Sequence, residues 1–318
     1  YGAEHPEYFA LVQGERRLQA FGGGPQPCLT NPEVLDLVTR SVLEEIAAHP
    51  DRRNVSVSQT DNDLYCRCPA CETVNQAEGS PMGTQLAFVN AVAERVAERQ
   101  AGTQIGTLAY RHTRKPPARL RPGPNVQIQL ANIECCCLHP LAGSGCEKNA
   151  AFLADLRAWC RIAEQVYVWS YFTDFRYYDL PFPNLRSTGA NLRLFADLGV
   201  RGVFAQSHGG SVSGDMSDLR NYVLARLLWN PYLDGWSLVE EFCRLHYGPA
   251  GEEILAYLVR LHDRAEGLGI HPACFATPEE LGLDEGFARE AMEAFARARA
   301  AAVERGGPEH VARVEKAS

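Results

Sequence analysis

An alternating apolar stretch in this chain, VSVSQ, ends abruptly in Asp61, Asn62 and Asp63. The alternation is typical of a buried strand, so two carboxylates and a carboxamide stand where that strand ends. Short polar side chains at such a place either form a turn or face a ligand. Carboxylates that face a ligand can transfer protons, and cleavage of a glycosidic bond needs a pair of them. Asp61 is therefore our first candidate for a catalytic residue.

Glu134 is the second candidate. It ends the sequence VQIQLANIE, whose apolar residues should shield the carboxyl group partly from water. Partial burial disfavours the ionised form of a carboxyl group, and this suits a general acid. The alternative is an ion pair of Glu134 with Arg111 or Lys148 that joins two loops. We interpret Glu134 and Asp61 as the catalytic pair.

Amides and aromatic rings follow the other apolar stretches. Amides can hold the hydroxyl groups of a sugar, and rings can stack on the apolar face of a pyranose. Trp169 and Tyr171 are two positions apart and should share one face of a strand, although such rings could also fill a core. The candidates for substrate binding are Asn62, Tyr110, His112, Asn132, Trp169, Tyr171 and Gln206.

Eleven cysteines are many for such a chain, and three of them, Cys66, Cys68 and Cys71, form a C-x-C-x2-C motif. A structural zinc ion usually needs four ligands, so this motif is a weak metal site by itself. Cys137, His139 or Cys146 could supply a fourth ligand only if the fold brings them close to the motif. Disulfides and reduced packing thiols are the alternatives. We therefore predict no cofactor beyond a structural zinc at this cluster, and keep a cysteine-centred metalloenzyme as a competing interpretation.

The candidate residues need a scaffold, and the sequence repeats apolar and amphipathic stretches in alternation. Such βα units predict a parallel sheet with helices outside it. Two further units upstream would make the eight of a TIM-type (β/α)8 barrel, with an open doubly wound sheet as runner-up. The carboxyl ends of barrel strands meet on one face, where the polar residues would converge. The six predicted strands are residues 26–30, 54–59, 104–110, 125–134, 165–172 and 200–207.

The chain of 318 residues divides by pattern into two regions. The pattern of residues 1–214 predicts a partial barrel that lacks its first strands. The pattern of residues 215–318 predicts a helical extension packed on that barrel. The sequence begins without methionine and with residues typical of a domain interior, so we expect a piece of a longer protein. A secreted or periplasmic location follows if the full-length chain carries a signal peptide, and the location is otherwise open.

The composition of the chain limits the classes of partner that it can bind. The formal net charge is −8, which argues against binding to a nucleic-acid backbone. Hydrophobic residues make up 46% of the chain, enough for a substantial core. No apolar run approaches the ~18 residues of a membrane span. We expect a carbohydrate substrate, no nucleic acid and no membrane span, and the sequence leaves the oligomeric state open.

Several segments in order, among them HPEYFALVQGERR, VSVSQTDND, CRCPAC, IGTLAYRHTRKPP, NIECC and LLWNPYLD, resemble the domain of unknown function 4838. That family includes glycoside hydrolase family 163, whose members are endo-β-N-acetylglucosaminidases acting on N-glycans. The resemblance implies a glycosidase-like (β/α)8 barrel with Asp61, Asn62 and Glu134 in its site. It also implies a retaining mechanism in which the substrate's acetamide is the nucleophile. Glu134 would protonate the leaving oxygen and Asp61 would orient the acetamide, or the two roles would be reversed.

The chain departs from the family pattern at two places. It reads WSY, with Ser170 where the family has an aspartate, and it has Ala205 and Gln206 where an acidic residue is common. If those acids contact sugar, specificity or activity differs here. The alternatives are therefore a carbohydrate-binding protein that has lost catalysis, or a hydrolase of another glycan such as a uronic-acid-containing polysaccharide.

Overall fold

The computed structural model describes residues 1–19, 24–143, 145–209 and 214–318. Contacts divide the chain into two compact units, each made of several segments. Unit 1 comprises Tyr1–Ala131, Ala154–Trp169 and Gly199–Gly202, and unit 2 comprises Asn132–Leu153, Ser170–Leu198 and Val203–Ser318. The boundary that the sequence pattern suggests at residue 214 stays a prediction.

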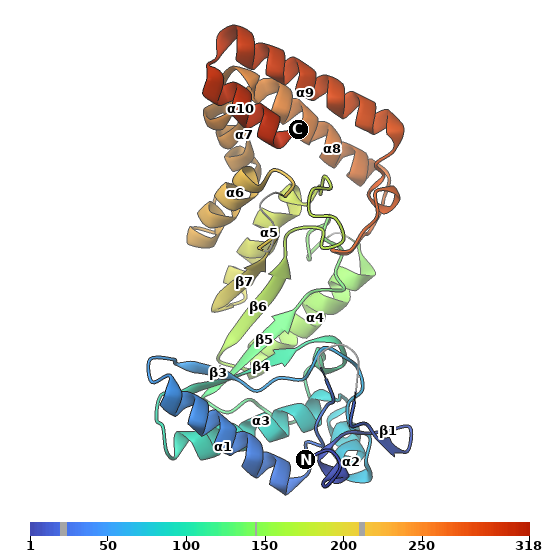
Figure 1. Ribbon diagram of the computed structural model, residues 1–318, viewed down its shortest axis with the longest axis vertical. Helices are drawn as coiled ribbons and strands as arrows, with labels where there is room; N and C mark the ends of the chain where they lie inside the picture. Colours follow the sequence, from blue (N-terminus) through green and yellow to red (C-terminus); the bar gives the residue numbers. More distant parts are fainter. Residues whose placement is uncertain (20–23, 144, 210–213) are drawn as a thin grey trace. The chain divides into compact units, whose positions relative to one another are not determined.

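One sheet of five strands has the order β3-β4-β5-β6-β7 (Figure 1). Its first three neighbouring pairs are parallel, with Ile105 opposite Val126 and Ile128 opposite Val166. Because the strand order follows the chain order, each crossover leads to the adjacent strand. The predicted mixed α/β fold with a parallel sheet is confirmed. The strands are β3 (Asn54–Ser56), β4 (Gln104–Ala109), β5 (Val126–Ala131), β6 (Val166–Tyr171) and β7 (Gly202–Gln206).

The prediction of a strand at residues 26–30 is wrong. This segment forms one isolated antiparallel bridge, between Phe9 and Pro27, and then leads into a helix. Pro25 and Pro27 have no backbone N–H, so the segment cannot donate a regular ladder of hydrogen bonds. Five of the six predicted strands are present, each shorter than its apolar stretch.

Unit 1 places helices beside its strands. Asn31 caps the first helix, since its Oδ1 accepts hydrogen bonds from the backbone of Glu33 at 2.9 Å and Val34 at 3.3 Å. α3 packs against α1, α2 and β4. A hairpin near the N-terminus has two strands of only two residues each, and these are too short to give a periodic pattern in the sequence. These elements are β1 (Leu11–Val12), β2 (Glu15–Arg16), α1 (Pro32–Ala48), α2 (Pro69–Glu78) and α3 (Met82–Ala97).

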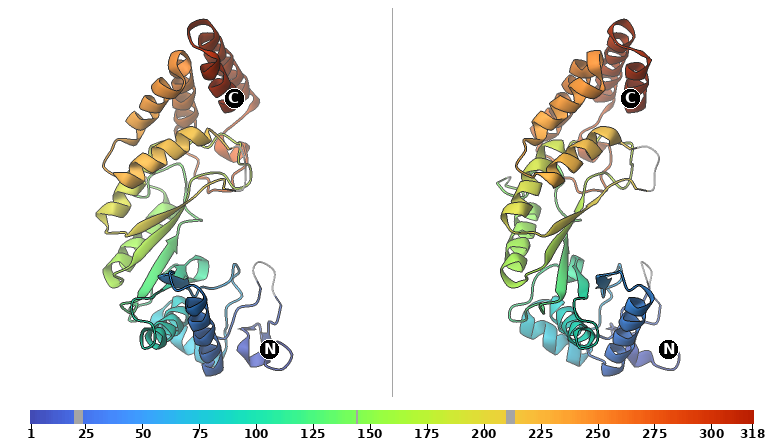
Figure 2. Two further views of the ribbon diagram at one scale, coloured as in Figure 1. Left: turned by 60° about the vertical axis from the view of Figure 1, so that its left-hand side comes forward. Right: turned by 90° about the vertical axis from the view of Figure 1, so that its left-hand side faces the viewer.

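Unit 2 is mainly helical, and from Ser217 onward its elements are helices throughout the described residues. α8 packs against α7 and α9, and Figure 2 shows α9 and α10 side by side in red. α4 (Glu147–Ile162) has residues in both units. The other helices are α5 (Leu185–Asp197), α6 (Ser217–Trp229), α7 (Gly235–His246), α8 (Gly251–Gly267), α9 (Glu285–Arg305) and α10 (Pro308–Ala317).

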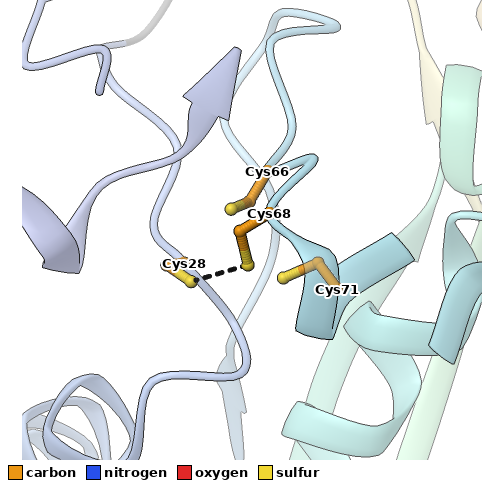
Figure 3. A group of neighbouring side chains, drawn as sticks. All are labelled: Cys28, Cys66, Cys68 and Cys71. Carbon is orange, nitrogen blue, oxygen red and sulfur yellow. Dashed lines mark hydrogen bonds between the residues drawn. The ribbon is translucent and has the colours of Figure 1, made fainter. Parts of the chain in front are cut away.

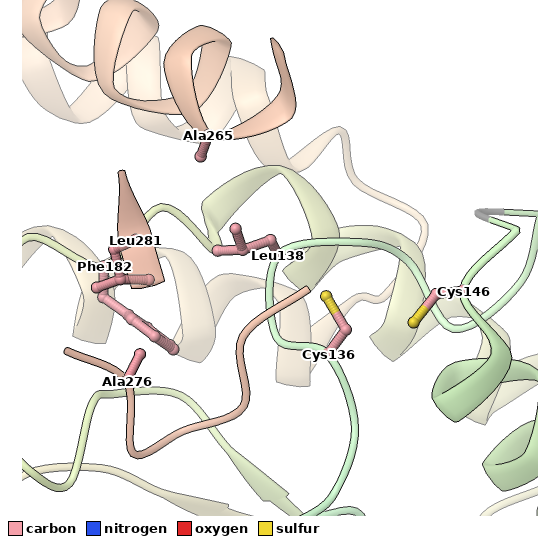
Figure 4. Packing of buried hydrophobic residues seen from close by; sticks show 7 residues of the cluster. All are labelled: Cys136, Leu138, Cys146, Phe182, Ala265, Ala276 and Leu281. Atoms are coloured by element: carbon pink, nitrogen blue, oxygen red, sulfur yellow. The ribbon is translucent and has the colours of Figure 1, made fainter. Parts of the chain in front are cut away.

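One buried cluster in unit 2 joins loops that are far apart in the sequence (Figure 4). It packs the segment after β5 against the end of α8 and the turn before α9. Apolar burial of this kind stabilises a fold by roughly 25 cal/mol per Å². The members are Cys136, Leu138, Cys146, Phe182, Ala265, Ala276 and Leu281. Among the described residues, no helix combines the length and the apolar character that crossing a bilayer requires.

His262 on α8 fixes the start of α5. Its side chain is 1% exposed. Nδ1 lies 2.8 Å from the carbonyl oxygen of Leu258, and Nε2 accepts a hydrogen bond from the backbone N–H of Leu185 at 3.2 Å. A neutral ring with its proton on Nδ1 satisfies both contacts. Burial lowers the pKa of His262 from 6.5 to about 4.

Unit 2 should therefore lose stability in mild acid. Below the ordinary pKa of 6.5 the unfolded chain takes up a proton at His262, whereas the folded chain resists it down to about 4. The contribution of neutral His262 to the free energy of unfolding is thus fully present above pH 6.5. This contribution falls by roughly 2–3 kcal/mol as the pH drops towards 4. Urea unfolding at pH 7.5, 6 and 5 measures this slope. A His262→Gln variant, which cannot titrate, should flatten it, and an equal slope in both proteins would contradict the account.

Candidate functional site

In unit 1, the loops after β3 and β4 are joined by hydrogen bonds. Tyr110 Oη donates to Asp61 Oδ1 at 3.0 Å, and Gln59 Nε2 donates to the carbonyl oxygen of Tyr110 at 2.7 Å. The Asp61 side chain is 70% exposed, so a ligand can reach its second oxygen. Burial, and then the hydrogen bond to Asp61, raise the pKa of Tyr110, which keeps its proton for that bond. The structure brings Asp61 and Tyr110 together.

Arg111 neutralises the neighbouring acid. Its guanidinium contacts Asp63 through two nitrogens, with Nε 3.1 Å from Oδ1, and its Nη1 lies 3.9 Å from Asp61. The hydrogen bonds from Arg111 lower the pKa of Asp63. Arg111 has a φ of 52°, a left-handed conformation that is uncommon outside glycine. Such strain gathers at functional sites, and here it directs a cation onto the acids after β3.

His112 is held rather than free. Its side chain is 9% exposed, its Nδ1 lies 3.2 Å from Asp63 Oδ1, and its ring stacks on Tyr65 with centroids 4.6 Å apart. Burial lowers the pKa of His112 although Asp63 opposes the shift. These contacts show a structural function of the ring, and its predicted contact with a substrate stays a prediction.

Asn62 braces the loop that carries Asp61. Its Nδ2 donates to the carbonyl oxygen of Gly24 at 2.9 Å, and its Oδ1 accepts from the backbone N–H of Leu64 at 3.0 Å. Gln26 completes the brace, since its side-chain amide exchanges hydrogen bonds with the backbone of Thr60 at 3.1 and 3.2 Å. Gln26 was not predicted, because nothing in its sequence neighbourhood marks it. The substrate contact predicted for Asn62 stays a prediction.

In unit 2, Asn132 and Glu134 follow β5. Asn132 Nδ2 donates to Ser170 Oγ at 3.2 Å, and among the described residues Asn132 Oδ1 is buried without a hydrogen-bond donor. Buried polar atoms are usually paired, so an unpaired one calls for an explanation such as a ligand. Glu134 is half-buried in the turn that follows, as its apolar neighbourhood predicts. Ser170 is itself buried.

The aromatic rings predicted to stack on a sugar, Trp169 and Tyr171, lie on β6. Burial alternates along β6, so Trp169 and Tyr171 are both half-buried and lie on the same face of the strand, as predicted. Trp169 belongs to unit 1, whereas Tyr171 and the half-buried Gln206 belong to unit 2. In unit 2 the ring of Tyr171 meets Phe175 edge-on, with centroids 5.6 Å apart.

Asp174 shapes the loop after β6 in unit 2. It is fully buried, and its carboxylate accepts backbone hydrogen bonds from Arg176 at 2.8 Å, Tyr177 at 3.0 Å and Ala276 at 2.7 Å. Three N–H donors can replace the water that a buried carboxylate loses. The loop is therefore fixed to the segment before α9.

Unit 1 contains a cavity of about 370 Å³ beside its edge strand, β3. It lies between α1 and the residues that continue β3, and Val38, Val42, Val57 and Gln59 are among its lining residues. Gln59 connects this cavity with the strand-end group, because it also binds the backbone of Tyr110. A ligand bound in the cavity could thus extend towards Asp61.

The cysteine motif gains a partner that was not predicted. Cys28, in the segment before α1, lies with Cys66, Cys68 and Cys71, and all four are buried. The proposed fourth ligands, Cys137, His139 and Cys146, belong to unit 2, where Cys136, Cys146 and His271 form a second group. Cys28 could not be found from spacing, since it precedes the motif by about forty residues in a proline-rich stretch.

The structure thus brings Asp61, Tyr110 and His112 into one group of unit 1. Hydrogen bonds join Tyr110 to Asp61 and both Arg111 and His112 to Asp63, and a 3.9 Å ion pair joins Arg111 to Asp61. It places Asn132, Glu134, Tyr171 and Gln206 in unit 2. A comparison with curated proteins finds no match. A family model does match: residues 1–259 of the 318 fit the family described as "Domain of unknown function (DUF4838)", and the chain belongs to that family.

Proposed function

We propose that this protein is a glycoside hydrolase acting on glycans that contain N-acetylglucosamine, with endo-β-N-acetylglucosaminidase action as the specific form. The observation that carries the proposal is the hydrogen-bonded group after β3 and β4, in which an exposed Asp61 is held by Tyr110 at 3.0 Å. Enzymes with an α/β barrel usually carry their catalytic acids and hydrogen-bonding groups at the carboxyl ends of the parallel strands. The reaction class rests on the relation to glycoside hydrolase family 163 that the sequence resemblance implies.

The proposed scaffold is a (β/α)8 barrel to which the five observed strands belong. Barrel enzymes build their sites from the loops after the strands, and the residues in question occupy such loops after β3, β4 and β5. Asn132 Oδ1, which is buried and receives no hydrogen bond from the described residues, supports a ligand at the end of β5, because a sugar hydroxyl would supply a donor.

The proposed reaction has two steps and retains configuration. The acetamide oxygen of the substrate attacks the anomeric carbon while Glu134 gives its proton to the leaving oxygen, so that the glycosidic bond breaks. Water then opens the cyclic oxazolinium intermediate and returns a proton to Glu134. The resemblance alone assigns to Asp61 the acceptance of a hydrogen bond from the acetamide N–H. The pairing of Asp61 with Tyr110 supports this role, since it fixes one oxygen and leaves the other exposed.

A second candidate is a carbohydrate-binding protein that has lost catalysis. The residue in its favour is Ser170, at a position where the resemblance leads us to expect an aspartate. Ser170 is buried, and its Oγ accepts a hydrogen bond from Asn132 Nδ2 at 3.2 Å. Under this alternative the rings of Trp169 and Tyr171 would still stack on sugars. It predicts glycan binding without turnover.

Paired substrates test the participation of the acetamide. Aryl β-N-acetylglucosaminides should be cleaved, and aryl β-glucosides, which have a hydroxyl in place of the acetamide, should be cleaved at least about 100-fold more slowly. Asp61→Asn should lower kcat on the first substrate by about 10²-fold, whereas the Arg111-bound Asp63→Asn serves as a matched control with a smaller loss. Equal rates on both substrates would contradict the acetamide mechanism.

A further inference from the structure

We propose that Cys28, Cys66, Cys68 and Cys71 bind one structural zinc ion in unit 1. The four sulfur atoms lie within 4.8 Å of one another, and the side chains point toward a common centre (Figure 3). They come from three places in the chain: the segment before α1, the loop after β3, and the first turn of α2. Convergence of four buried thiols is the arrangement of a closed zinc site with four cysteine ligands.

The spacing fits a single ion. Zinc–sulfur bonds of about 2.3 Å in a tetrahedron place the sulfurs about 3.8 Å apart. The sulfurs of Cys28 and Cys68 are 3.8 Å apart. A multinuclear iron–sulfur cluster would hold its cysteine sulfurs farther apart, because bridging sulfides lie between its irons. Four thiolates with tetrahedral geometry favour zinc among mononuclear ions.

The surroundings offer the donors that such a site needs. Zinc with four thiolates carries a net charge of −2, which neighbouring groups must compensate. The backbone N–H of Leu11 donates to Cys66 Sγ at 3.3 Å, and Nη1 of Arg16 lies 3.9 Å from the same sulfur. Thr30 Oγ1 lies 3.3 Å from Cys71 Sγ. Donors to the ligating sulfurs are characteristic of the surroundings of metal sites.

Helix α2 contributes as well. Cys68 is its N-cap residue and Cys71 lies in its first turn, with Pro69 between them. Free N–H groups and the helix dipole make a helix N-terminus favourable for negatively charged sulfur. The start of α2 is therefore suited to thiolates rather than to thiols packed as hydrophobic groups.

The local core explains why an ion would matter. The cluster around these cysteines has six buried members, and the other two are the small residues Ala10 and Val12. The N-terminal segment adds two strands of only two residues each. So little apolar surface stabilises the segment weakly, and metal binding would supply folding free energy directly. The ion would also hold the segments that carry its ligands next to the loop of Asp61. Hydrogen bonds of Gln26 and Asn62 already join the segment before α1 to that loop.

Elemental analysis of the full-length protein, purified without chelators, tests this site. We expect close to one zinc per chain, lost in both Cys28→Ser and Cys71→Ser. Cys160→Ser, a half-buried cysteine of α4, is the matched control and should keep its zinc. Cys136→Ser should also keep it, because Cys136 belongs to the other cysteine group. Zinc that persists in Cys28→Ser and Cys71→Ser, zinc lost from Cys136→Ser alone, or stoichiometric iron would overturn the proposal.

A second measurement avoids the variants, in case they fail to fold. The wild-type protein is treated with a strong chelator and a thiol-alkylating reagent, and the labelled cysteines are identified by mass spectrometry. Removal of zinc should expose Cys28, Cys66, Cys68 and Cys71 together to the reagent and lower the thermal unfolding midpoint. Four thiols with unchanged reactivity, or two disulfides without zinc, would overturn the proposal. Neither readout depends on glycan cleavage, so failure of the proposed function would leave this result intact.

Discussion

Replacing Glu134 by glutamine is expected to lower kcat on an N-glycan by about 10²–10⁴-fold, the contribution of a general acid. Glutamine keeps the size of the side chain and its hydrogen-bonding oxygen but has no transferable proton. Glu134 is half-buried in a turn, so the substitution removes no large part of the core and the fold should persist. Circular dichroism and the thermal unfolding midpoint check the fold, and steady-state kinetics measure the loss.

The leaving group makes this experiment specific. An aryl N-acetylglucosaminide with an acidic phenol needs little protonation, so Glu134→Gln should be impaired much less on it than on the glycan. Glu290→Gln, an exposed glutamate of α9, is the matched control and should keep full activity on both substrates. An equal loss on both substrates would assign Glu134 to another step, and unchanged turnover of the glycan would remove it from the mechanism.

Replacing Arg220 by methionine is expected to destabilise unit 2 by about 3–5 kcal/mol, since it leaves a buried carboxylate without its cation. The side chains of Arg220 and Asp215 are 5% and 7% exposed and form an ion pair. Arg220 also donates to Asn184 Oδ1 and to the carbonyl oxygen of Phe182, each at 2.5 Å. One guanidinium therefore joins the start of α6 to the loop before α5.

Denaturant unfolding at pH 7.5 measures the effect of Arg220→Met. Arg299→Met is the matched control, because Arg299 pairs with Glu315 at the surface, where the two side chains are 56% and 51% exposed. Surface pairs contribute ~1 kcal/mol or less, so this variant should unfold close to the wild type. Similar midpoints for Arg220→Met and wild type would contradict the importance of the buried network.

Local signals in the sequence predicted the repeating elements well. Apolar stretches located β3 to β7. The same signals failed at residues 26–30, where apolar and proline residues occur together and hydrogen bonding decides the outcome. They also missed α2, which begins at Pro69 directly after the cysteines.

The site was predictable in residue type but not in pairing. Asp61 and Tyr110 could be proposed as residues at strand ends, whereas their hydrogen bond depends on how two loops pack. Cys28 was missed for the same reason, because a ligand that is distant in sequence has no fixed spacing from its partners. Arg111 entered the sequence argument as a partner for Glu134, and in the structure it binds Asp63.

The most direct test of the proposed function is incubation of the full-length protein with a panel of N-glycans, followed by mass spectrometry of the products. The account predicts cleavage within the chitobiose core or after another N-acetylglucosamine, with new reducing ends that retain the β configuration when they are followed by NMR. Binding of the same glycans without any released product would contradict the account and favour a carbohydrate-binding protein that has lost catalysis.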